Sequence, residues 1–491
     1  MESIQVKTVD PISQELLKSA YQRGLKLSWD RFERLQPQDG FLRIGLSCPY
    51  GCLQGPCRID PFGRGPDRGL CGLDRDGMVA ALLLRLALSG ALEAMPEDNP
   101  ASEPSWAPAL KAALSRAIKN LGEDRISSGE IQKAAALLNR PMESAGGMIT
   151  QALRLAVLTI GWLSKGPAAS QGRKKSFPLR VGYGLLAQKE INIGICGRPS
   201  PEFLKALLAE VDKNLSATGQ VFSLGEFISL EGSYLPGVCT SGEAELVLSS
   251  GKINFLIAGP GTDPSIIELC HALNIPTASS MDPKSVRDLV QKAKEKKNAT
   301  IQVSFNPQSS LVEEAEVAVG SSVLEEYFKK APAKKLAFLG GADHPYHPLG
   351  WIPTEVTPAL QGKGFAVTAW GDCGLWMAKK GLASHKNKRP VQIMDGRQGP
   401  LPALKALAAS GRLKDVKGIC YTGIKSCQDL AVALGLAGLG LRVGIAVPLP
   451  LWGSEKVRNL LQEKLAALGG SLTHFDHPAQ AEEILDWFLK N

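Results

Sequence analysis

Four cysteines in a glycine-rich stretch constrain this chain more than any other feature. They fall in the run SCPYGCLQGPCRIDPFGRGPDRGLCG, with the spacing Cys48-x3-Cys52-x4-Cys57-x13-Cys71. A cubane iron–sulfur cluster needs four thiolates on a loop that wraps around it, and glycines permit such a path. The spacing therefore predicts one [4Fe-4S] cluster on these four residues. A structural zinc site is the alternative, although such sites favour close C-x2-C pairs, which this run lacks.

Six further cysteines bring the total to ten in 491 residues. The first residues, MESIQVKTVD, do not form a basic stretch followed by an apolar core, so we expect a cytoplasmic protein. In that reducing compartment, free thiols indicate metal or redox chemistry rather than disulfides. Two apolar stretches, 80–95 and 152–163, carry charges or are too short to cross a bilayer, so no membrane association is expected.

The formal net charge is +8, from 56 basic and 48 acidic residues. A basic surplus raises the question of nucleic-acid binding. The charges occur mostly singly along predicted helices, and the densest run is Arg173, Lys174 and Lys175. No nucleic-acid partner is therefore expected.

Hydrophobic periodicity divides the chain into a helical first part and an α/β remainder. Apolar residues recur every three to four positions, which predicts helices, over 14–34, 76–95, 107–121, 128–139 and 141–163. Short strand-like runs alternate with helices over 191–195, 220–224, 254–258 and 301–305, and again over 335–340, 366–370, 391–394, 418–421 and 443–447. We therefore expect an α/β fold with a helical N-terminal domain, 1–180, and two Rossmann-like doubly wound domains, 181–333 and 334–491.

Doubly wound folds place their ligand sites at the carboxyl ends of the strands. Cys196, Cys373 and Cys420 are expected at or after strand ends, and Cys239 in the loop LPGVCTSGE before a helix. Four thiols converging from two adjacent domains would hold a second metal site, and their mutual repulsion would require a bound metal. A buried free cysteine is also among the commonest core residues, which is the alternative for each one singly.

The first cysteine segment also carries a family resemblance. CLQGPCRI, the CG that follows after 13 residues and the helix DRDGMVAALLLRLALSGA resemble the N-terminal cluster segment of the nickel–iron carbon monoxide dehydrogenases, relatives of the hybrid-cluster (prismane) proteins. The resemblance implies a prismane-like fold of one helical and two Rossmann-like domains. It also implies that the [4Fe-4S] cluster relays electrons to a buried nickel–iron–sulfur cluster, in a homodimer with a ferredoxin-like electron partner.

Three loops resemble parts of the family's catalytic site. PGVCTSGE offers Cys239 as a metal ligand, GDCGLWMAKKG offers Cys373, and GICYTGIKSCQDL offers Cys420. A slip of one residue in the second loop also makes Asp372 a candidate. The resemblance places Lys456 beside the active cluster, and a solvated lysine in the first turn of a helix is the alternative.

Other ligand positions of the family are not kept. Ile257 and Gly341 stand where cysteines are expected, and Arg198 stands where the histidine ligand is expected. Ser47 replaces a cysteine of the interface cluster, so no bridging cluster is expected. Cys196 is the candidate to compensate by moving the site one residue along its turn. Arg198 would place a fixed cation in the pocket, where it would bind an anionic substrate or a cluster oxygen.

Two histidines, His344 and His347, lie next to the missing cysteine and are candidate nitrogen ligands, with ordinary loop residues as the alternative. Nickel and iron bridged by sulfide need soft thiolate and imidazole ligands, and about half of the expected set is gone. Nickel binding and carbon monoxide oxidation by the family's mechanism are therefore not expected.

The sequence thus supports three functional hypotheses. The first is an iron–sulfur oxidoreductase with one [4Fe-4S] relay cluster and a remodelled interdomain metal site, holding a second iron–sulfur or mixed-metal cluster, that acts on a small molecule. The second is a true carbon monoxide dehydrogenase with shifted ligands. The third is a non-catalytic electron-transfer or assembly subunit. Iron and nickel stoichiometry distinguishes the three.

Overall fold

The structure is a computed structural model of residues 1–491. It describes residues 6–34, 48–49, 54–60, 64–96, 108–123, 126–139, 144–164, 176–230, 233–279, 281–295, 312–318, 321–330, 334–384, 387, 390–394, 396, 398–449, 451–475 and 481–490. The predicted strand at 301–305, together with Ser47 and Cys52, lies outside the described residues.

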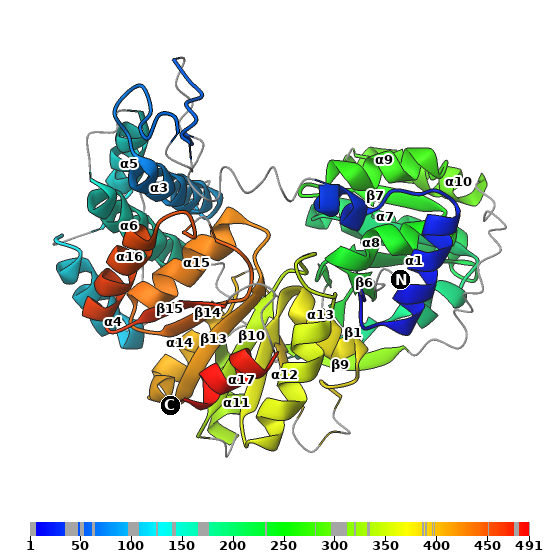
Figure 1. The fold of residues 1–491 in the computed structure, drawn as a ribbon. Coiled ribbons are helices and arrows are strands. Elements are labelled where there is room, and N and C mark those ends of the chain that lie inside the picture. Colours follow the sequence, from blue (N-terminus) through cyan, green and yellow to red (C-terminus); the bar gives the residue numbers. More distant parts are fainter. Residues whose placement is uncertain are drawn as a thin grey trace.

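Four of the five predicted N-terminal helices are confirmed. They are α3 (Arg75–Glu93), α4 (Pro108–Asn120), α5 (Gly129–Asn139) and α6 (Ala145–Ser164). The prediction of one helix over 14–34 is wrong, because α1 (Pro11–Gln22) ends before Gly24, whose φ of 73° turns the chain, and a second helix covers 28–34. In Figure 1, α1 lies away from the other four helices, and it packs against α8 (Ala244–Ser249).

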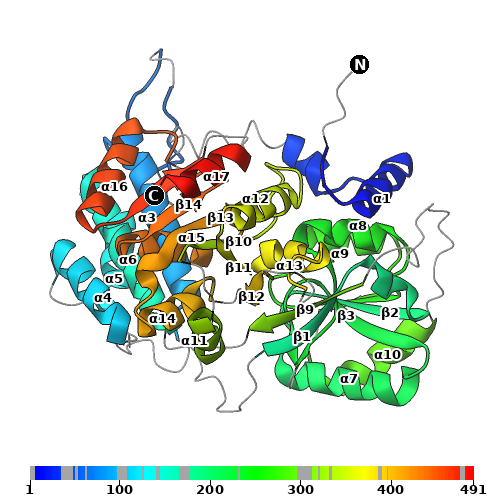
Figure 2. The ribbon, with the colours of Figure 1, turned by 90° about the horizontal axis from the view of Figure 1, so that it is seen from below.

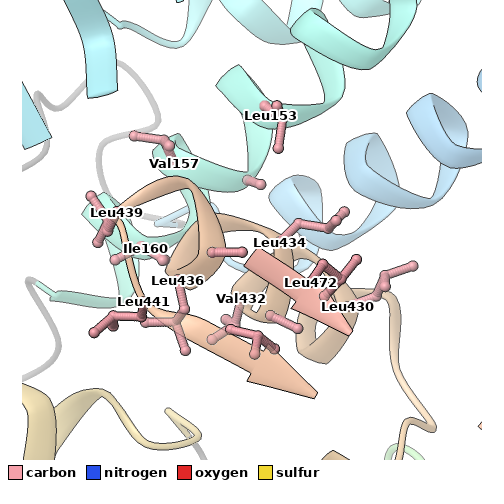
Figure 3. Close-up of a cluster of buried hydrophobic side chains, with 14 of the residues drawn as sticks. Leu153, Val157, Ile160, Leu430, Val432, Leu434, Leu436, Leu439, Leu441 and Leu472 are labelled. Atoms are coloured by element: carbon pink, nitrogen blue, oxygen red, sulfur yellow. The ribbon is translucent and has the colours of Figure 1, made fainter. Parts of the chain in front are cut away.

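Helices α3 and α6 pack against α15 (Cys427–Gly438) to form the largest apolar core. Leu153, Val157 and Ile160 of α6 lie against the leucines of α15 in Figure 3. The helices approach so closely that a side chain at Gly435 would stand 2.5 Å from the carbonyl oxygen of Ala156. Helix α6 is long and apolar enough to cross a membrane, but 72% of its apolar window is buried, as expected for a core helix.

Within the described residues, the strands form one 13-stranded sheet in the order β15-β14-β13-β10-β11-β12-β9-β1-β6-β3-β2-β7-β8. Their bounds are β1 (Ser176–Val181), β2 (Ile191–Cys196), β3 (Gly219–Gly225), β6 (Gly237–Thr240), β7 (Phe255–Ala258), β8 (Thr277–Ala278), β9 (Glu313–Ala318), β10 (Leu336–Gly341), β11 (Ala366–Trp370), β12 (Gln392–Met394), β13 (Val416–Gly423), β14 (Arg442–Ile445) and β15 (Ser471–His474). A separate two-stranded ribbon joins β4 (Ser229–Leu230) to β5 (Ser233–Tyr234).

Helices cover both faces of this sheet, as Figures 1 and 2 show. Beside those already named, they are α7 (Pro201–Leu215), α9 (Pro264–Ala272), α10 (Val286–Glu295), α11 (Ser321–Lys330), α12 (Trp351–Gly362), α13 (Gly371–Lys379), α14 (Leu401–Ala409), α16 (Glu455–Ala467) and α17 (Ala481–Leu489). The α/β class with two Rossmann-like halves and a helical N-terminal part is thus confirmed. Within each half, all pairings are parallel.

The two halves meet at one antiparallel pair, β1 with β9. Strand direction therefore reverses at this seam. Six steps along the sheet separate β3 from β10, and a twist of about 20–25° per strand turns the two by roughly 120–150°. This rotation brings the carboxyl ends of the strands in the two halves to face a common space.

Candidate functional site

The predicted cluster loop folds back on itself around Cys57. The Cys48 backbone N–H donates to the Cys57 carbonyl over 2.9 Å, and the Leu70 N–H donates to the Cys57 Sγ over 3.4 Å. Cys71 is exposed, whereas Cys48 and Cys57 are half-buried. Backbone N–H groups directed at cysteine sulfurs help to set the properties of iron–sulfur clusters.

Helix α3 anchors this loop. Asp74 caps the start of α3 by accepting the Gly77 N–H over 2.9 Å, and Arg85, farther along the helix, donates to the Pro49 carbonyl. Below the loop, Ile59 and Met78 form a small buried apolar cluster. The apolar run that makes α3 a core helix therefore also fixes the cysteine loop on its N-terminal end.

Thiols in a loop with N–H donors fit the soft ligand set that an iron–sulfur cluster requires. The fourth thiol, Cys52, is not among the described residues. Within the described residues, no group of three or more His, Cys, Asp and Glu side chains is arranged to hold a metal ion. The chemistry of the loop thus fits the group, and its four-ligand geometry stays a prediction.

A cavity of about 580 Å³ lies between the two halves of the sheet, a volume typical of small-molecule sites. It is lined by the residues that follow strands β2, β3, β6 and β7 of one half and β10, β11, β12 and β13 of the other. Glu93, at the end of α3, adds a wall from the helical part. This is the position that the strand-end rule predicts for a ligand site.

The charged groups of the cavity form pairs. Lys425 Nζ lies 2.8 Å from Asp263 Oδ2, and Arg198 Nε lies 3.8 Å from Glu226 Oε2. Burial raises the pKa of Glu226 above its ordinary range. Arg198, predicted to place a cation here, does line the cavity.

The remaining carboxylates of the cavity also have donors from the protein. Asp372 accepts the Ser241 N–H over 2.9 Å and the Asp343 N–H over 2.8 Å. Glu93 Oε2 accepts the Gln428 N–H over 3.1 Å. Asp429 is bonded to Ser426, the residue that caps α15, and burial raises the pKa of its carboxyl.

The four cysteines predicted to converge here are not among the lining residues of the cavity. Cys196 and Cys239 belong to one apolar cluster and Cys373 and Cys420 to another, all at 5% exposure or less. Burial raises the pKa of each of the four thiols. These observations do not support a second metal site built from the four.

The strand assignments explain this placement. Cys239 lies on strand β6 rather than in a loop, and Cys420 lies within β13 instead of at its end. Cys373 is in the first turn of α13 and points into the core, so its neighbour Asp372 reaches the cavity. The one-residue slip noted in the sequence thus favours Asp372 as the cavity residue.

The positions where family cysteines are missing could not hold a ligand without local change. Ile257 is fully buried in an apolar cluster. Gly341 has a φ of 110°, and a Cβ there would stand 2.1 Å from the Gly423 carbonyl oxygen. The backbone itself therefore occupies the space of the expected side chain.

Lys456 and the two histidines lie elsewhere. Lys456 is in the first turn of α16, 68% exposed, with its Nζ 3.5 Å from Asp76 Oδ2, and it is not among the residues that line the interdomain cavity. His344 stacks on Tyr346, with ring centroids 4.9 Å apart. His347 is buried against the Ala446 carbonyl, and burial lowers its pKa. The predicted roles of these residues at the cavity gain no support.

A buried charge network lies behind the cavity. Lys379 Nζ is 2.7 Å from Glu243 Oε1 and 3.2 Å from Asp10 Oδ2. Glu243 Oε2 accepts the Thr240 hydroxyl over 3.2 Å, and Thr240 is also bonded to Asp343. Burial and the charge of Asp372 hold the pKa of Asp343 well above its ordinary value. The network connects α1 to the strand ends below the cavity.

Sequence reasoning missed Lys425, Glu226, Asp263 and Asp429 as cavity residues. Lys425 and Asp429 stand within the quoted run GICYTGIKSCQDL, five and nine residues after Cys420. In this run only Cys420 was assigned to the site, and the loop and the helix start that follow it were not. The signal was present, because residues after a predicted parallel strand are the ones that reach a site.

Comparisons with known proteins agree with this architecture. No protein-family model matches the chain. Carbon monoxide dehydrogenase 1 of Carboxydothermus hydrogenoformans is 49% identical over 84 residues, 17% of this chain and 13% of that protein. Carbon monoxide dehydrogenase of Rhodospirillum rubrum is 48% identical over 81 residues, 16% of this chain and 12% of that protein. The sequence match thus spans about an eighth of the length of these relatives.

The structural match extends over the whole chain. Carbon monoxide dehydrogenase IV from Carboxydothermus hydrogenoformans superimposes with a TM-score of 0.79 at 17% identity, covering 99% of both chains. A nickel-free carbon monoxide dehydrogenase from Thermococcus sp. AM4 also gives 0.79, at 16% identity, over 99% of this chain and 97% of the other. One segment of the chain is thus strongly similar to carbon monoxide dehydrogenases, and the whole chain shares their fold.

Proposed function

We propose that the protein is an iron–sulfur oxidoreductase similar to carbon monoxide dehydrogenase, in which Cys48, Cys52, Cys57 and Cys71 hold one [4Fe-4S] cluster. The observation that carries the proposal is the loop geometry at Cys57, where the Leu70 N–H is directed at the sulfur. Such a cluster supplies one-electron transfer when bound. The chain's own residues hold the cluster on the end of α3 and shield one side of it with Ile59 and Met78.

The family's nickel–iron–sulfur group does not fit the described residues of the interdomain cavity. The polar side-chain groups of these residues are carboxylates, an ammonium, a guanidinium and hydroxyls. The nickel–iron–sulfur group needs thiolate and imidazole ligands instead. The described residues of the cavity therefore do not support carbon monoxide oxidation by that group. The size and charge of the cavity support a site for a small organic molecule, with Arg198 and Lys425 as its cations.

Electron exchange with a ferredoxin-like partner would occur at the cluster loop. Leu70, beside Cys71, is 73% exposed and is the most exposed large apolar side chain of the described residues. An exposed apolar group next to a surface cluster supports docking of a small redox protein. Cytoplasmic location, a homodimer, and domain boundaries near residues 180 and 333 belong to the same proposal.

A non-catalytic electron-transfer or assembly subunit is the second candidate. The separation of the four interdomain thiols into two apolar clusters favours it, because no second cluster would then be needed. Turnover of a small-molecule substrate distinguishes the two candidates, since only the first predicts it.

Anaerobic purification followed by iron, nickel, zinc and sulfide quantitation tests the proposal. We expect about four irons and four sulfides per chain and no nickel. Stoichiometric nickel would support a true carbon monoxide dehydrogenase, and about eight irons would restore a second cluster. Zinc in place of iron would refute the proposal.

A further inference from the structure

The interdomain cavity has an imbalance of hydrogen-bonding groups. Each of its five carboxylates has a donor or a cation from the protein within the described residues. In contrast, the Trp370 indole N–H has no partner among the residues that the structure describes, although the side chain is only 1% exposed. Buried polar groups without partners are rare and costly, so such a group needs an explanation.

A second group of the same kind lies beside it. The Tyr421 hydroxyl, fully buried, also has no partner in the described part of the chain. The two rings meet edge to face, with centroids 5.3 Å apart. A Cβ built on Gly399 would stand 3.7 Å from the Tyr421 hydroxyl oxygen and 3.8 Å from the Trp370 Nε1. Both polar atoms therefore lie close to Gly399, and of the two aromatic residues Trp370 is the one that lines the cavity.

The Trp370 indole forms part of the cavity wall. Trp370 lines the cavity together with Gly396, and a Cβ on Gly396 would lie 3.6 Å from the indole Cδ1, the atom next to Nε1. The middle of the indole, at the atoms Cδ2 and Cε2 that its two rings share, packs on Gly340 of the neighbouring strand. The indole is thus placed at the wall of the cavity and not in a closed core.

We propose that the cavity binds a small organic acid, one carboxylate oxygen of which accepts hydrogen bonds from the Trp370 indole N–H and the Tyr421 hydroxyl. The indole N–H can only donate and the hydroxyl can also donate, so one acceptor would satisfy both. Helices α13 and α15 both begin at the cavity, and their N-terminal ends favour a negative group. Arg198, 64% exposed and only loosely paired, is free to turn toward an anion.

This inference deepens the proposed function, and it rests on that function in placing the chemistry at the cavity. It names the class of molecule that the iron–sulfur oxidoreductase would act on. The Trp370 N–H and Tyr421 hydroxyl position the ligand, and no redox step is assigned to them.

Isothermal titration of the anaerobically purified protein with acetate, oxalate and succinate tests the inference, with acetamide and inorganic phosphate as comparison probes. We expect at least one of the three acids to bind more tightly than acetamide and phosphate. Trp370→Phe and Tyr421→Phe should each weaken that binding about tenfold, the effect of one hydrogen bond to a charged group.

Matched substitutions separate a ligand role from a structural role. Tyr183→Phe removes a hydroxyl that is bonded to Ser13 Oγ over 2.7 Å, and Trp487→Phe removes an N–H bonded to Thr473 Oγ1 over 3.0 Å. These two should lower the melting temperature and leave acid binding unchanged. Tyr421→Phe should leave the melting temperature of the ligand-free protein unchanged or higher, because no made hydrogen bond is lost.

The inference is wrong if no acid of the panel binds, if phosphate binds as tightly as the acids, or if Trp370→Phe and Tyr421→Phe both bind the acid as the unchanged protein does. Iron content is measured on the same samples. Iron without acid binding would overturn the inference alone, whereas acid binding without iron would overturn the proposed function alone.

Discussion

The cysteine loop and the interdomain cavity are the two candidate functional sites of this chain. They differ in the polar atoms that they present and in the exposure of their cysteines. The loop presents sulfur on the surface, with Cys71 exposed and Cys57 accepting a backbone N–H. The cavity presents oxygen and nitrogen, and the thiols near it are turned into apolar clusters. The loop thus offers soft sulfur atoms, whereas the cavity offers hard, charged oxygen and nitrogen groups. The two sites must therefore be tested separately.

The largest expected effect is on the loop. Cys57→Ser should lower the iron content strongly and bleach the absorbance in the blue, because a hydroxyl replaces one of the four proposed thiolate ligands. Iron quantitation and visible spectroscopy check this. Cys427→Ser is the matched control, since Cys427 is half-buried in α15 and outside the loop, and it should keep its iron. Equal loss of iron in both variants would contradict the assignment.

The next effect concerns the charge network behind the cavity. Lys379→Met leaves Glu243 and Asp10 without their buried cation, so the free energy of unfolding should fall by about 3–5 kcal/mol. Lys456→Met, at an exposed lysine, should change it by less than about 0.5 kcal/mol. Chemical denaturation measures both. Iron per folded chain should be unchanged in each variant, and a loss of iron in Lys379→Met would show that the two regions are not independent.

A third substitution asks whether the family's ligand can be restored at the cavity. Gly341→Cys should lower the free energy of unfolding by about 3 kcal/mol, because the residue has a positive φ and its Cβ meets the Gly423 carbonyl. Gly411→Cys is a matched control, with a φ of 69° and open space around the Cβ position, and it should cost about 1 kcal/mol. Nickel bound by Gly341→Cys but not by the control would overturn the view of the cavity as a hard-ligand site.

The smallest effect is a pH trend. Burial and the charge of Asp372 raise the pKa of Asp343, so its contribution to stability is full below its ordinary pKa of 3.8 and is lost as the pH rises through the folded-state pKa. Asparagine cannot ionise. The melting temperature of Asp343→Asn relative to the unchanged protein should therefore move in the variant's favour as pH rises. A difference that is constant with pH would contradict a raised pKa.

Much of the fold could be predicted from periodicity, because buried parallel strands are continuous apolar runs. Ile191–Cys196 and Leu336–Gly341 are of this kind. Strand β1 contains Pro178, and β9 reads EEAEVA, with three glutamates among its first four residues. Both resemble surface segments, and only their pairing with each other shows that they join the halves.

The candidate sites were predictable to different extents. Local spacing shows the cysteine loop, because its ligands lie close together in the chain. The cavity gathers Arg198, Asp372 and Lys425 from strand ends that are far apart, and only the twist of the sheet brings them together. Cys239 was misplaced because GVCT is too short to be distinguished from a loop by alternation.

The antiparallel pairing of β1 with β9 has a consequence for how molecules reach the cavity. Six residue pairs, from Ser176 with Ala318 to Val181 with Glu313, join the two halves in one continuous hydrogen-bonded ladder. Two-domain proteins commonly open by rotation about a few flexible linking residues. Here such a rotation would have to break that ladder. A ligand that enters the cavity would therefore pass the side chains at its rim, such as the exposed Arg198.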